Sequence, residues 1–262
     1  MVAPNGARRG KSDHPALPIT DDEVVETARE CQVAGADGIH IHIRDDAGEH
    51  FLDADRYAAL LKRLEHEVPG MYLQVTSEAA GRYSAQEQQD MMRALRPAHV
   101  SVAMREMVRS PADWSDARAF YHWAASNNVD VQHILYAPDE VSAFVDAVSD
   151  GRIPGTHHLI QLVQGTYAHG SDGTVDLDKY LDELDRASTH SFDWMLCAFG
   201  TSETAGLAEA ARCGGKARAG FENSLWHADG SLAADNAARI RDVDAALRET
   251  EFKLTREKEQ VS

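Results

Sequence analysis

Residues 38–45 read GIHIHIRD, and this stretch carries most of the information about the fold. Successive side chains of a β-strand point to opposite faces, so the three isoleucines share one face while His40 and His42 share the other, about 7 Å apart along the strand. Isoleucines suit a face that is covered by helices. The alternation therefore predicts a strand with helices on its outer face and both histidines pointing inward.

The chain on either side of this stretch repeats a strand–helix order. Strands are predicted near residues 1–5, 37–44, 71–76, 98–104, 129–136, 157–164, 193–199 and 216–222. Amphipathic helices are predicted near residues 21–34, 54–67, 84–95, 111–127, 138–150, 176–188, 202–213 and 233–249. Such alternation implies parallel strands with right-handed crossovers. Eight units in about 250 residues fit a closed barrel, so residues 1–262 are expected to form one α/β domain, a (β/α)8 TIM barrel.

Composition excludes several functional classes. The 262 residues carry a formal charge of -17, with 43% hydrophobic residues, which is typical of a soluble globular protein. An acidic chain repels the nucleic-acid backbone, so no nucleic-acid partner is expected. No apolar run approaches the roughly 18 residues of a membrane span, and no apolar stretch typical of a secretory signal follows Met1, so we expect a cytoplasmic protein without a membrane partner. The cysteines, Cys31, Cys197 and Cys213, have no C-x-x-C spacing, which argues against disulfides and a Cys-based zinc site.

A candidate metal site follows from the rule that barrel enzymes place their chemistry at the carboxyl ends of the strands. His40 and His42 converge inside the barrel, and KARAGFEN, residues 216–223, places Arg218 and Glu222 on one face of a nearby strand. Two histidines, a carboxylate and an open position describe a catalytic zinc site, although Fe²⁺ or Mn²⁺ suits the same donors. The alternatives are a hydrogen-bonded pair of core histidines and a salt bridge between Arg218 and Glu222 alone.

Two predicted loops at the same end could bind a substrate. APNGARRGK, residues 3–11, presents arginines that suit a carboxylate or a phosphate, or else forms a solvated basic loop. QVTSEAAG, residues 74–81, ends a strand with Thr76 and Ser77, whose hydroxyl groups could donate hydrogen bonds to a substrate oxygen.

Four segments carry a family resemblance. They are the opening APNGAR…HPALPIT, the GIHIHIRD stretch, the QVTS strand and the ARAGFENSLWHADGSLAADNA segment. Together, and in this order along nearly the whole chain, they resemble the beta-keto acid cleavage enzymes, the family typified by 3-keto-5-aminohexanoate cleavage enzyme. The H-x-H-x-R-D and G-x-E-[DN] elements make the resemblance specific.

The resemblance implies a homo-oligomeric barrel that binds Zn²⁺ through His40, His42 and Glu222. Such enzymes condense a β-keto acid with acetyl-CoA and exchange fragments, which gives acetoacetate and a new acyl-CoA. The family arginine corresponds to Arg218, which would orient the substrate or stabilise developing negative charge. Thr76 or Ser77 lies where the family places a hydroxyl contact to the substrate.

Two departures from the family pattern bear on the chemistry. Asn223 stands where the typical member has an aspartate that acts with the arginine in deprotonation. Asn cannot accept a proton at neutral pH, so a metal-bound hydroxide, a substrate carboxylate or another side chain must serve as the base, or the reaction differs. Arg8 stands where the typical member has a glutamate that faces the amino group of its substrate. Charge inversion at a recognition contact predicts a substrate tail of opposite sign, so the substrate is expected to be an anionic or neutral β-keto acid, such as a β-keto dicarboxylate.

Two other functions use the same residues. A metal-dependent aldolase or hydrolase on the same barrel would act without CoA, and Asn223 favours it more than an aspartate would. A catalytically silent metal-binding barrel would retain zinc and consume no keto acid. A requirement for acetyl-CoA separates the first of these from the acyl exchange.

Overall fold

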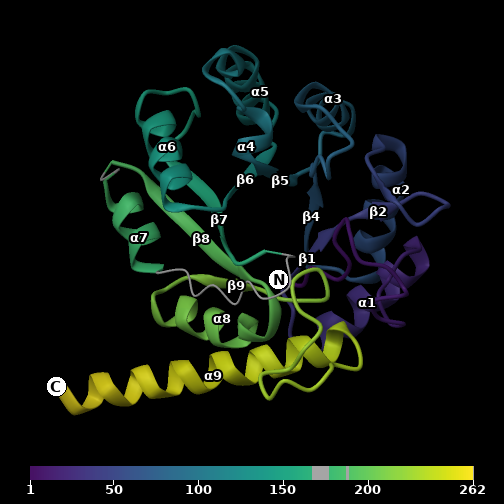
Figure 1. The fold of residues 1–262 in the computed structure, drawn as a ribbon, viewed down its shortest axis with the longest axis vertical. Helices are drawn as coiled ribbons and strands as arrows, with labels where there is room; N and C mark the ends of the chain where they lie inside the picture. Colours follow the sequence, from purple (N-terminus) through teal and green to yellow (C-terminus); the bar gives the residue numbers. More distant parts are fainter. Residues whose placement is uncertain (167–176, 187–188, 262) are drawn as a thin grey trace.

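The computed structural model of the protein describes residues 1–166, 177–186 and 189–261, with side chains as far as residue 250. Its centre is a parallel sheet of seven strands in the order β1-β4-β5-β6-β7-β8-β9. The strands are β1 (Gly38–Ile41), β4 (Tyr72–Thr76), β5 (His99–Ala103), β6 (Asp130–Leu135), β7 (His157–Gln164), β8 (Ser191–Ala198) and β9 (Lys216–Arg218). The sheet curls, and the helices lie along its outer side (Figure 1). The predicted α/β fold with parallel strands is therefore confirmed.

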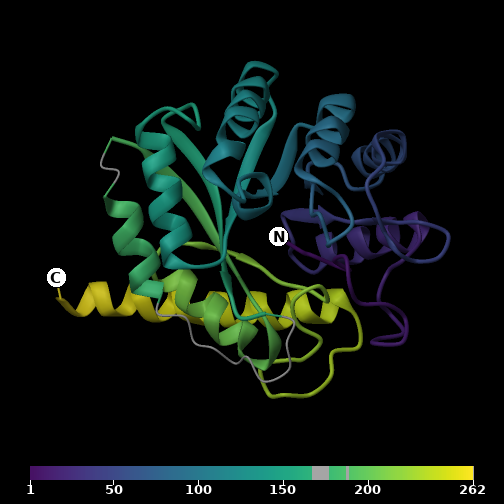
Figure 2. The same cartoon turned by 45° about the horizontal axis from the view of Figure 1, so that its top comes forward.

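Helices follow the strands in the predicted order. They are α1 (Asp21–Val33), α2 (Ala54–Glu67), α3 (Ala85–Leu95), α4 (Met104–Met107), η1 (Pro111–Asp113), α5 (Trp114–Ser126), α6 (Pro138–Ser149), α7 (Leu177–Asp185), η2 (Gly200–Ser202), α8 (Glu203–Arg212) and α9 (Asn236–Val261). Residues 176 and 187–188 of the helix predicted near 176–188 lie outside the described residues. The long α9 packs against α8 and α1, which Figure 2 shows from a second angle. None of the described helices is long and apolar enough to cross a membrane.

The strand predicted over residues 1–5 is wrong, because the structure has only one bridging residue there. Val2 forms isolated parallel bridges to Ile39 on β1 and to Ala219 just after β9. Its N–H donates to the Gly38 carbonyl at 2.8 Å, and its carbonyl accepts from His40 N–H at 2.8 Å. Pro4 has no N–H to continue this pattern. The sheet therefore has seven strands, with Val2 linking its two edges.

The last predicted strand is shorter than expected and ends before the candidate metal ligand. β9 stops at Arg218, and the Asn223 N–H closes a turn onto the Gly220 carbonyl at 2.8 Å. Gly220 has φ +139, and a Cβ there would lie 2.4 Å from the Ala3 carbonyl oxygen. The chain therefore leaves the sheet at this glycine, and Glu222 lies in a turn and not on a strand.

A short hairpin follows β1 and was not predicted. It pairs β2 (Ile43–Arg44) with β3 (His50–Phe51) in antiparallel fashion, outside the main sheet. Two-residue strands give no periodic signal, so only the structure shows that His50 returns to a position beside His42.

A buried ion pair joins α8 to α9 and gives a prediction about stability. The Arg239 side chain is fully buried and contacts Glu203 and Asp242. Arg239→Met leaves the buried Glu203 carboxylate without its cation, so we expect a loss of about 3 kcal/mol in the free energy of unfolding, measured by urea denaturation. Arg241→Met, which removes an exposed arginine of the same helix, should cost less than about 1 kcal/mol. Equal losses would show that the buried pair has no special role.

Candidate metal centre

Three buried side chains from distant parts of the sequence meet at one point. His40 on β1 and His42 just after it bring their Nε2 atoms to 3.0 Å from each other. Glu222 places Oε2 at 3.7 Å from His40 Nε2 and at 3.5 Å from His42 Nε2. The three side chains offer donor atoms that all lie within 4.8 Å of one another. The structure thus brings together the residues that the sequence predicted to meet, and this donor set suits a divalent transition metal.

Hydrogen bonds behind the histidines indicate where their protons are. His50 Nε2 lies 2.8 Å from the carbonyl oxygen of Glu78, which can only accept, so this nitrogen carries the proton. His50 Nδ1 therefore accepts from His42 Nδ1 at 3.4 Å, which leaves His42 Nε2 without a proton. His40 Nδ1 lies 2.9 Å from Gln74 Oε1, so His40 Nε2 is also without a proton.

In these tautomers three acceptors face one another at the centre of the cluster, whereas a proton on either Nε2 atom would make the 3.0 Å contact between His40 and His42 a hydrogen bond. Both Nε2 atoms direct a lone pair at this point, and within the described part of the chain Glu222 Oε2 has no hydrogen-bond partner. Three acceptors with no donor between them repel one another unless a cation lies among them. The cluster therefore fits a metal ion.

The protonation states also suit a metal. Burial, together with the nearby Arg218 guanidinium, lowers the pKa of His40 to about 4. Burial and the neighbouring His40 hold the pKa of His42 well below its usual value. Burial alone would raise the pKa of Glu222, but the Arg218 guanidinium at 2.7 Å, together with His40 and Arg9, outweighs it and the pKa is lowered. At neutral pH the cluster therefore offers two neutral imidazoles and one carboxylate, which are the forms that bind metals.

A close approach of the N-terminal loop holds Glu222 in place. Gly6 has φ +61, and a Cβ there would lie 2.5 Å from Glu222 Cγ. Any larger residue at position 6 would displace the carboxylate from the histidines. The APNGAR segment therefore contributes to the cluster through its backbone.

Arg218 and Asn223 lie directly beside Glu222 and are both buried. Arg218 donates to Glu222 Oε1 at 2.7 Å and to Asn223 Oδ1 at 3.4 Å. The salt bridge considered as an alternative is thus present, and it uses the carboxylate oxygen that faces away from the histidines. Asn223 Nδ2 is buried without a hydrogen-bond partner among the described residues, so this donor remains for a ligand.

The two hydroxyl groups after β4 differ in what they can offer. Ser77 donates its hydroxyl proton to the Ser101 carbonyl of the neighbouring strand at 2.9 Å. Thr76 Oγ1 accepts from the Glu78 N–H at 3.0 Å, which leaves the proton of Thr76 for another acceptor. Thr76 is therefore the better hydrogen-bond donor of the two.

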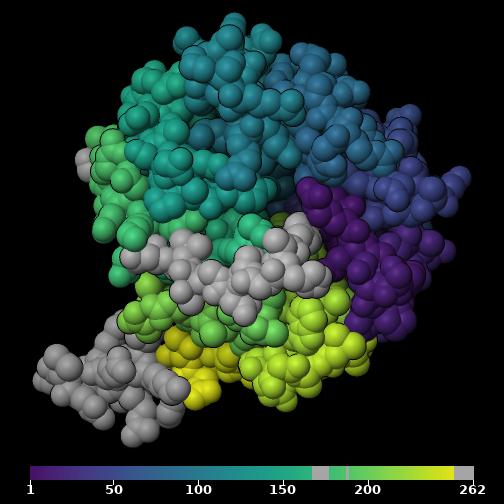
Figure 3. Space-filling view, viewed as in Figure 1, coloured from purple at the N-terminus to yellow at the C-terminus, as the bar shows by residue number. Residues whose placement is uncertain are grey.

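The cations of the first loop separate into different roles. Arg9 donates to the Phe221 carbonyl at 2.5 Å, and Lys11 pairs with Glu23 at 2.6 Å. Arg8, whose side chain is 56% exposed, reaches to 4.0 Å from Glu78 Oε1. This face of the molecule is hollowed beside the purple N-terminal segment in Figure 3. Arg8 is thus the loop cation that approaches Glu78, whereas Arg9 is bonded to the backbone on either side of Glu222.

Glu78 is a site residue that the sequence did not single out. Its Oε2 lies 4.0 Å from His42 Nε2, whereas its Oε1 lies 4.0 Å from the Arg8 guanidinium. Burial, followed by the charges of Glu222 and Glu106, raises the pKa of Glu78 to about 7. Glu78 directly follows Thr76 and Ser77, so the rule that sites lie after strand ends could have found it. No comparable signal marks Gln74 or His50.

The sequence matches one family model over almost its full length. Residues 1–260 match the model described as beta-keto acid cleavage enzyme. The chain is 28% identical over 255 residues to the 3-oxoadipate:acetyl-CoA acetyltransferase of Cupriavidus necator, which covers 95% of this chain and 87% of that protein. It is 21% identical over 248 residues to the 3-keto-5-aminohexanoate cleavage enzyme of Acetoanaerobium sticklandii, and the match covers 91% of this chain and 87% of that protein.

Solved structures share the fold at low sequence identity. The ternary complex of ObcA with a C4-CoA adduct and oxalate has a TM-score of 0.66 and 14% identity, covering 92% of this chain. The chain spans 64% of that ObcA chain. A type I 3-dehydroquinate dehydratase from Clostridium difficile has a TM-score of 0.58 and 10% identity, and the match covers 94% of this chain and 90% of that chain. The structures support the TIM-barrel-like fold alone, whereas the family model, which covers residues 1–260, shows that the chain belongs to the beta-keto acid cleavage enzyme family.

Proposed function

We propose that this protein is a metal-dependent enzyme that transfers an acyl group from a β-keto acid to coenzyme A. The keto acid R–CO–CH2–COO⁻ and acetyl-CoA would give R–CO–S-CoA and acetoacetate, which balances all atoms and charges. The observation that carries the proposal is the buried convergence of three lone pairs from His40, His42 and Glu222. Membership of the family and the printed activity of the Cupriavidus necator relative support the general reaction.

We propose that zinc binds to the cluster. We also propose that the sheet closes as a TIM barrel and that the protein is a cytoplasmic homo-oligomer, as the sequence predicts. When bound, the metal would supply a Lewis acid that polarises the ketone of the keto acid. Arg218 would stabilise the negative charge that develops on the substrate, since its guanidinium lies beside the proposed metal ligand Glu222. Thr76 would donate a hydrogen bond to a substrate oxygen, and Ser77 would hold the strand end in position.

Asn223 cannot accept a proton, so another group must act as the base, and Glu78 is the candidate. The step before acyl transfer removes a proton from the carbon between the ketone and the carboxylate. Glu78 offers a carboxylate oxygen 4.0 Å from His42 Nε2, and its pKa of about 7 suits proton exchange near neutral pH. We infer that Glu78 accepts this proton, while Asn223 orients Arg218.

Arg8 gives a prediction about the substrate tail. The guanidinium borders the cluster and is half exposed, so a second carboxylate of the substrate can reach it. The relative from Cupriavidus necator is named for 3-oxoadipate, which is a β-keto dicarboxylate. We expect Arg8→Glu to lower kcat/KM for dicarboxylic keto acids by about 10²-fold, chiefly through KM, because attraction becomes repulsion.

Lys11→Glu is the matched control for Arg8→Glu. It makes the same charge change in the same loop, but Lys11 pairs with Glu23 and lies outside the cluster. Its kcat/KM should stay within about threefold of the parent, since exposed charges act weakly at a distance. If Arg8→Glu used the dicarboxylate as well as the parent does, the assignment of Arg8 would fail.

A screen of β-keto acids on metal-analysed protein tests the function. Acetoacetate and acyl-CoA are followed by mass, with and without acetyl-CoA. We expect acetoacetate and acyl-CoA in equal amounts, and only when acetyl-CoA is present. Consumption of the keto acid without acetyl-CoA would instead support the aldolase or hydrolase that Asn223 left open. Zinc retained with no turnover of any keto acid would support the silent barrel.

A further inference from the structure

Two glutamines connect His40 on β1 to strand β6. His40 Nδ1 lies 2.9 Å from Gln74 Oε1, and Gln74 Nε2 donates to Gln132 Oε1 at 3.1 Å. Gln74 stands beside His40 in the register of β1 and β4, and Gln132 belongs to β6. All three side chains are buried. We call Gln74 and Gln132 the glutamine relay.

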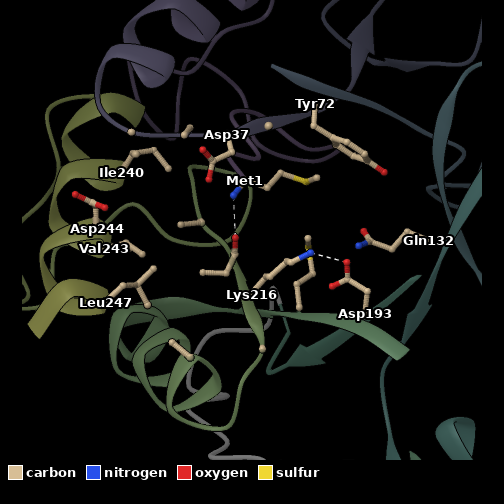
Figure 4. A pocket seen from close by; sticks show the side chains of 18 of the residues that line it. Met1, Asp37, Tyr72, Gln132, Asp193, Lys216, Ile240, Val243, Asp244 and Leu247 are labelled. Atoms are coloured by element: carbon tan, nitrogen blue, oxygen red, sulfur yellow. Dashed lines mark hydrogen bonds and ion pairs between the residues drawn. The ribbon is translucent and has the colours of Figure 1, made fainter. Parts of the chain in front are cut away.

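Gln132 lies away from the substrate side of the cluster. It lines a pocket of about 610 Å³ together with Met1 and with Tyr72 and Lys216, the residues that begin β4 and β9. Figure 4 shows Gln132 pointing into this pocket, across from the ion pair between Lys216 and Asp193. The metal ligand Glu222, in contrast, follows the end of β9. Gln132 therefore meets the cluster through Gln74.

The orientation of the two amides decides which nitrogen of His40 carries the proton. In the structure Gln74 presents its oxygen to His40 Nδ1, which places the proton on Nδ1 and leaves Nε2 free to bind a metal. If both amides rotated by half a turn, the NH2 of Gln74 would donate to Nδ1. The proton would then lie on Nε2, between His40 and His42, and that tautomer cannot bind a metal through Nε2.

We propose that the glutamine relay selects the metal-binding tautomer of His40, which makes Gln132 a positioning residue for the metal. This inference rests on the metal site of the proposed function. The acceptor oxygen of Gln132 is the feature that matters, because it holds the NH2 of Gln74 away from His40. Outer hydrogen bonds of this kind typically change metal affinity by roughly 10- to 100-fold.

Two substitutions at position 132 should act in opposite ways. Gln132→Met keeps the length of the side chain but removes the acceptor that holds the NH2 of Gln74 away from His40, so the dissociation constant for zinc should rise by about 10- to 100-fold. Gln132→Glu keeps an acceptor oxygen for the NH2 of Gln74, so it retains the orientation that favours binding, and the affinity should equal or exceed that of the parent. The pocket beside Gln132 leaves room for both side chains. The measurement is zinc competition against a chromophoric chelator.

Gln161→Met provides the matched control. Gln161 is a buried glutamine on the adjacent strand β7, and its Nε2 donates to Cys197 Sγ at 3.4 Å and not to a histidine. Its variant should bind zinc like the parent. Equal affinities for Gln132→Met and the parent would overturn the relay, as would an equal loss in Gln132→Met and Gln132→Glu, since a packing role does not distinguish an acceptor from a thioether. Failure of the parent itself to bind zinc would instead overturn the metal site of the proposed function.

Discussion

His42→Ala should lose metal binding and activity together. His42 is fully buried, and its Nε2 lies 3.0 Å from His40 Nε2 and 3.5 Å from Glu222 Oε2. Removing it leaves two donors, so zinc affinity should fall by more than the roughly 100-fold that an outer hydrogen bond costs. A bound metal contributes several kcal/mol to charge stabilisation, so kcat/KM should fall by at least about 10³-fold. Bound zinc and keto acid turnover are measured on the same sample.

His133→Ala separates this effect from the loss of a buried side chain. His133 is also buried on a strand, but it packs against Phe144 and Tyr121, with ring centroids 4.7 Å and 5.2 Å away. Its variant should lose stability and still bind zinc with the parent's affinity. If His42→Ala kept full zinc occupancy, the proposed ligands would be wrong, whatever the activity.

The sequence predicted the fold well where periodicity is strong. The strand at 157–164 agrees with β7 (His157–Gln164), and the helix at 54–67 agrees with α2 (Ala54–Glu67), because long alternating or amphipathic runs determine these elements locally. The strand predicted near 37–44 ends at Ile41 in the main sheet, and the other failures lie at residues 1–5 and 219–222. There the chain forms bridges and turns that depend on contacts between its two ends, which no local pattern records.

The candidate site was predictable as far as its residues lie at strand ends. His40, His42, Arg218 and Glu222 were found because a barrel gathers the ends of its strands, even though Glu222 lies in a turn. The partners that orient the histidines were not found. His50 reaches His42 through a hairpin of two-residue strands, and Gln132 reaches His40 through a second side chain, so their roles depend on tertiary contacts alone.

Glu78→Gln should nearly abolish turnover while leaving the metal in place. Gln keeps the size of the side chain but cannot accept a proton, and general-base catalysis contributes roughly 10² to 10⁴-fold, so kcat should fall by about 10³-fold. Zinc affinity should stay close to that of the parent, because the three donor atoms do not include Glu78. Single-turnover kinetics and zinc competition measure the two quantities.

Glu106→Gln is the control that isolates the base. Glu106 is a neighbouring carboxyl group whose Oε2 accepts from the Ala79 N–H at 2.9 Å, and burial raises its pKa as well. Its hydrogen bond is to the backbone and it acts on Glu78 only through its charge, so its variant should lower the pKa of Glu78 and keep kcat within about tenfold of the parent. Normal turnover by the Glu78→Gln variant would show that another group accepts the proton. Loss of zinc from Glu78→Gln would indicate that Glu78 is a fourth metal ligand, because replacing a base that does not contact the metal should leave metal binding unchanged.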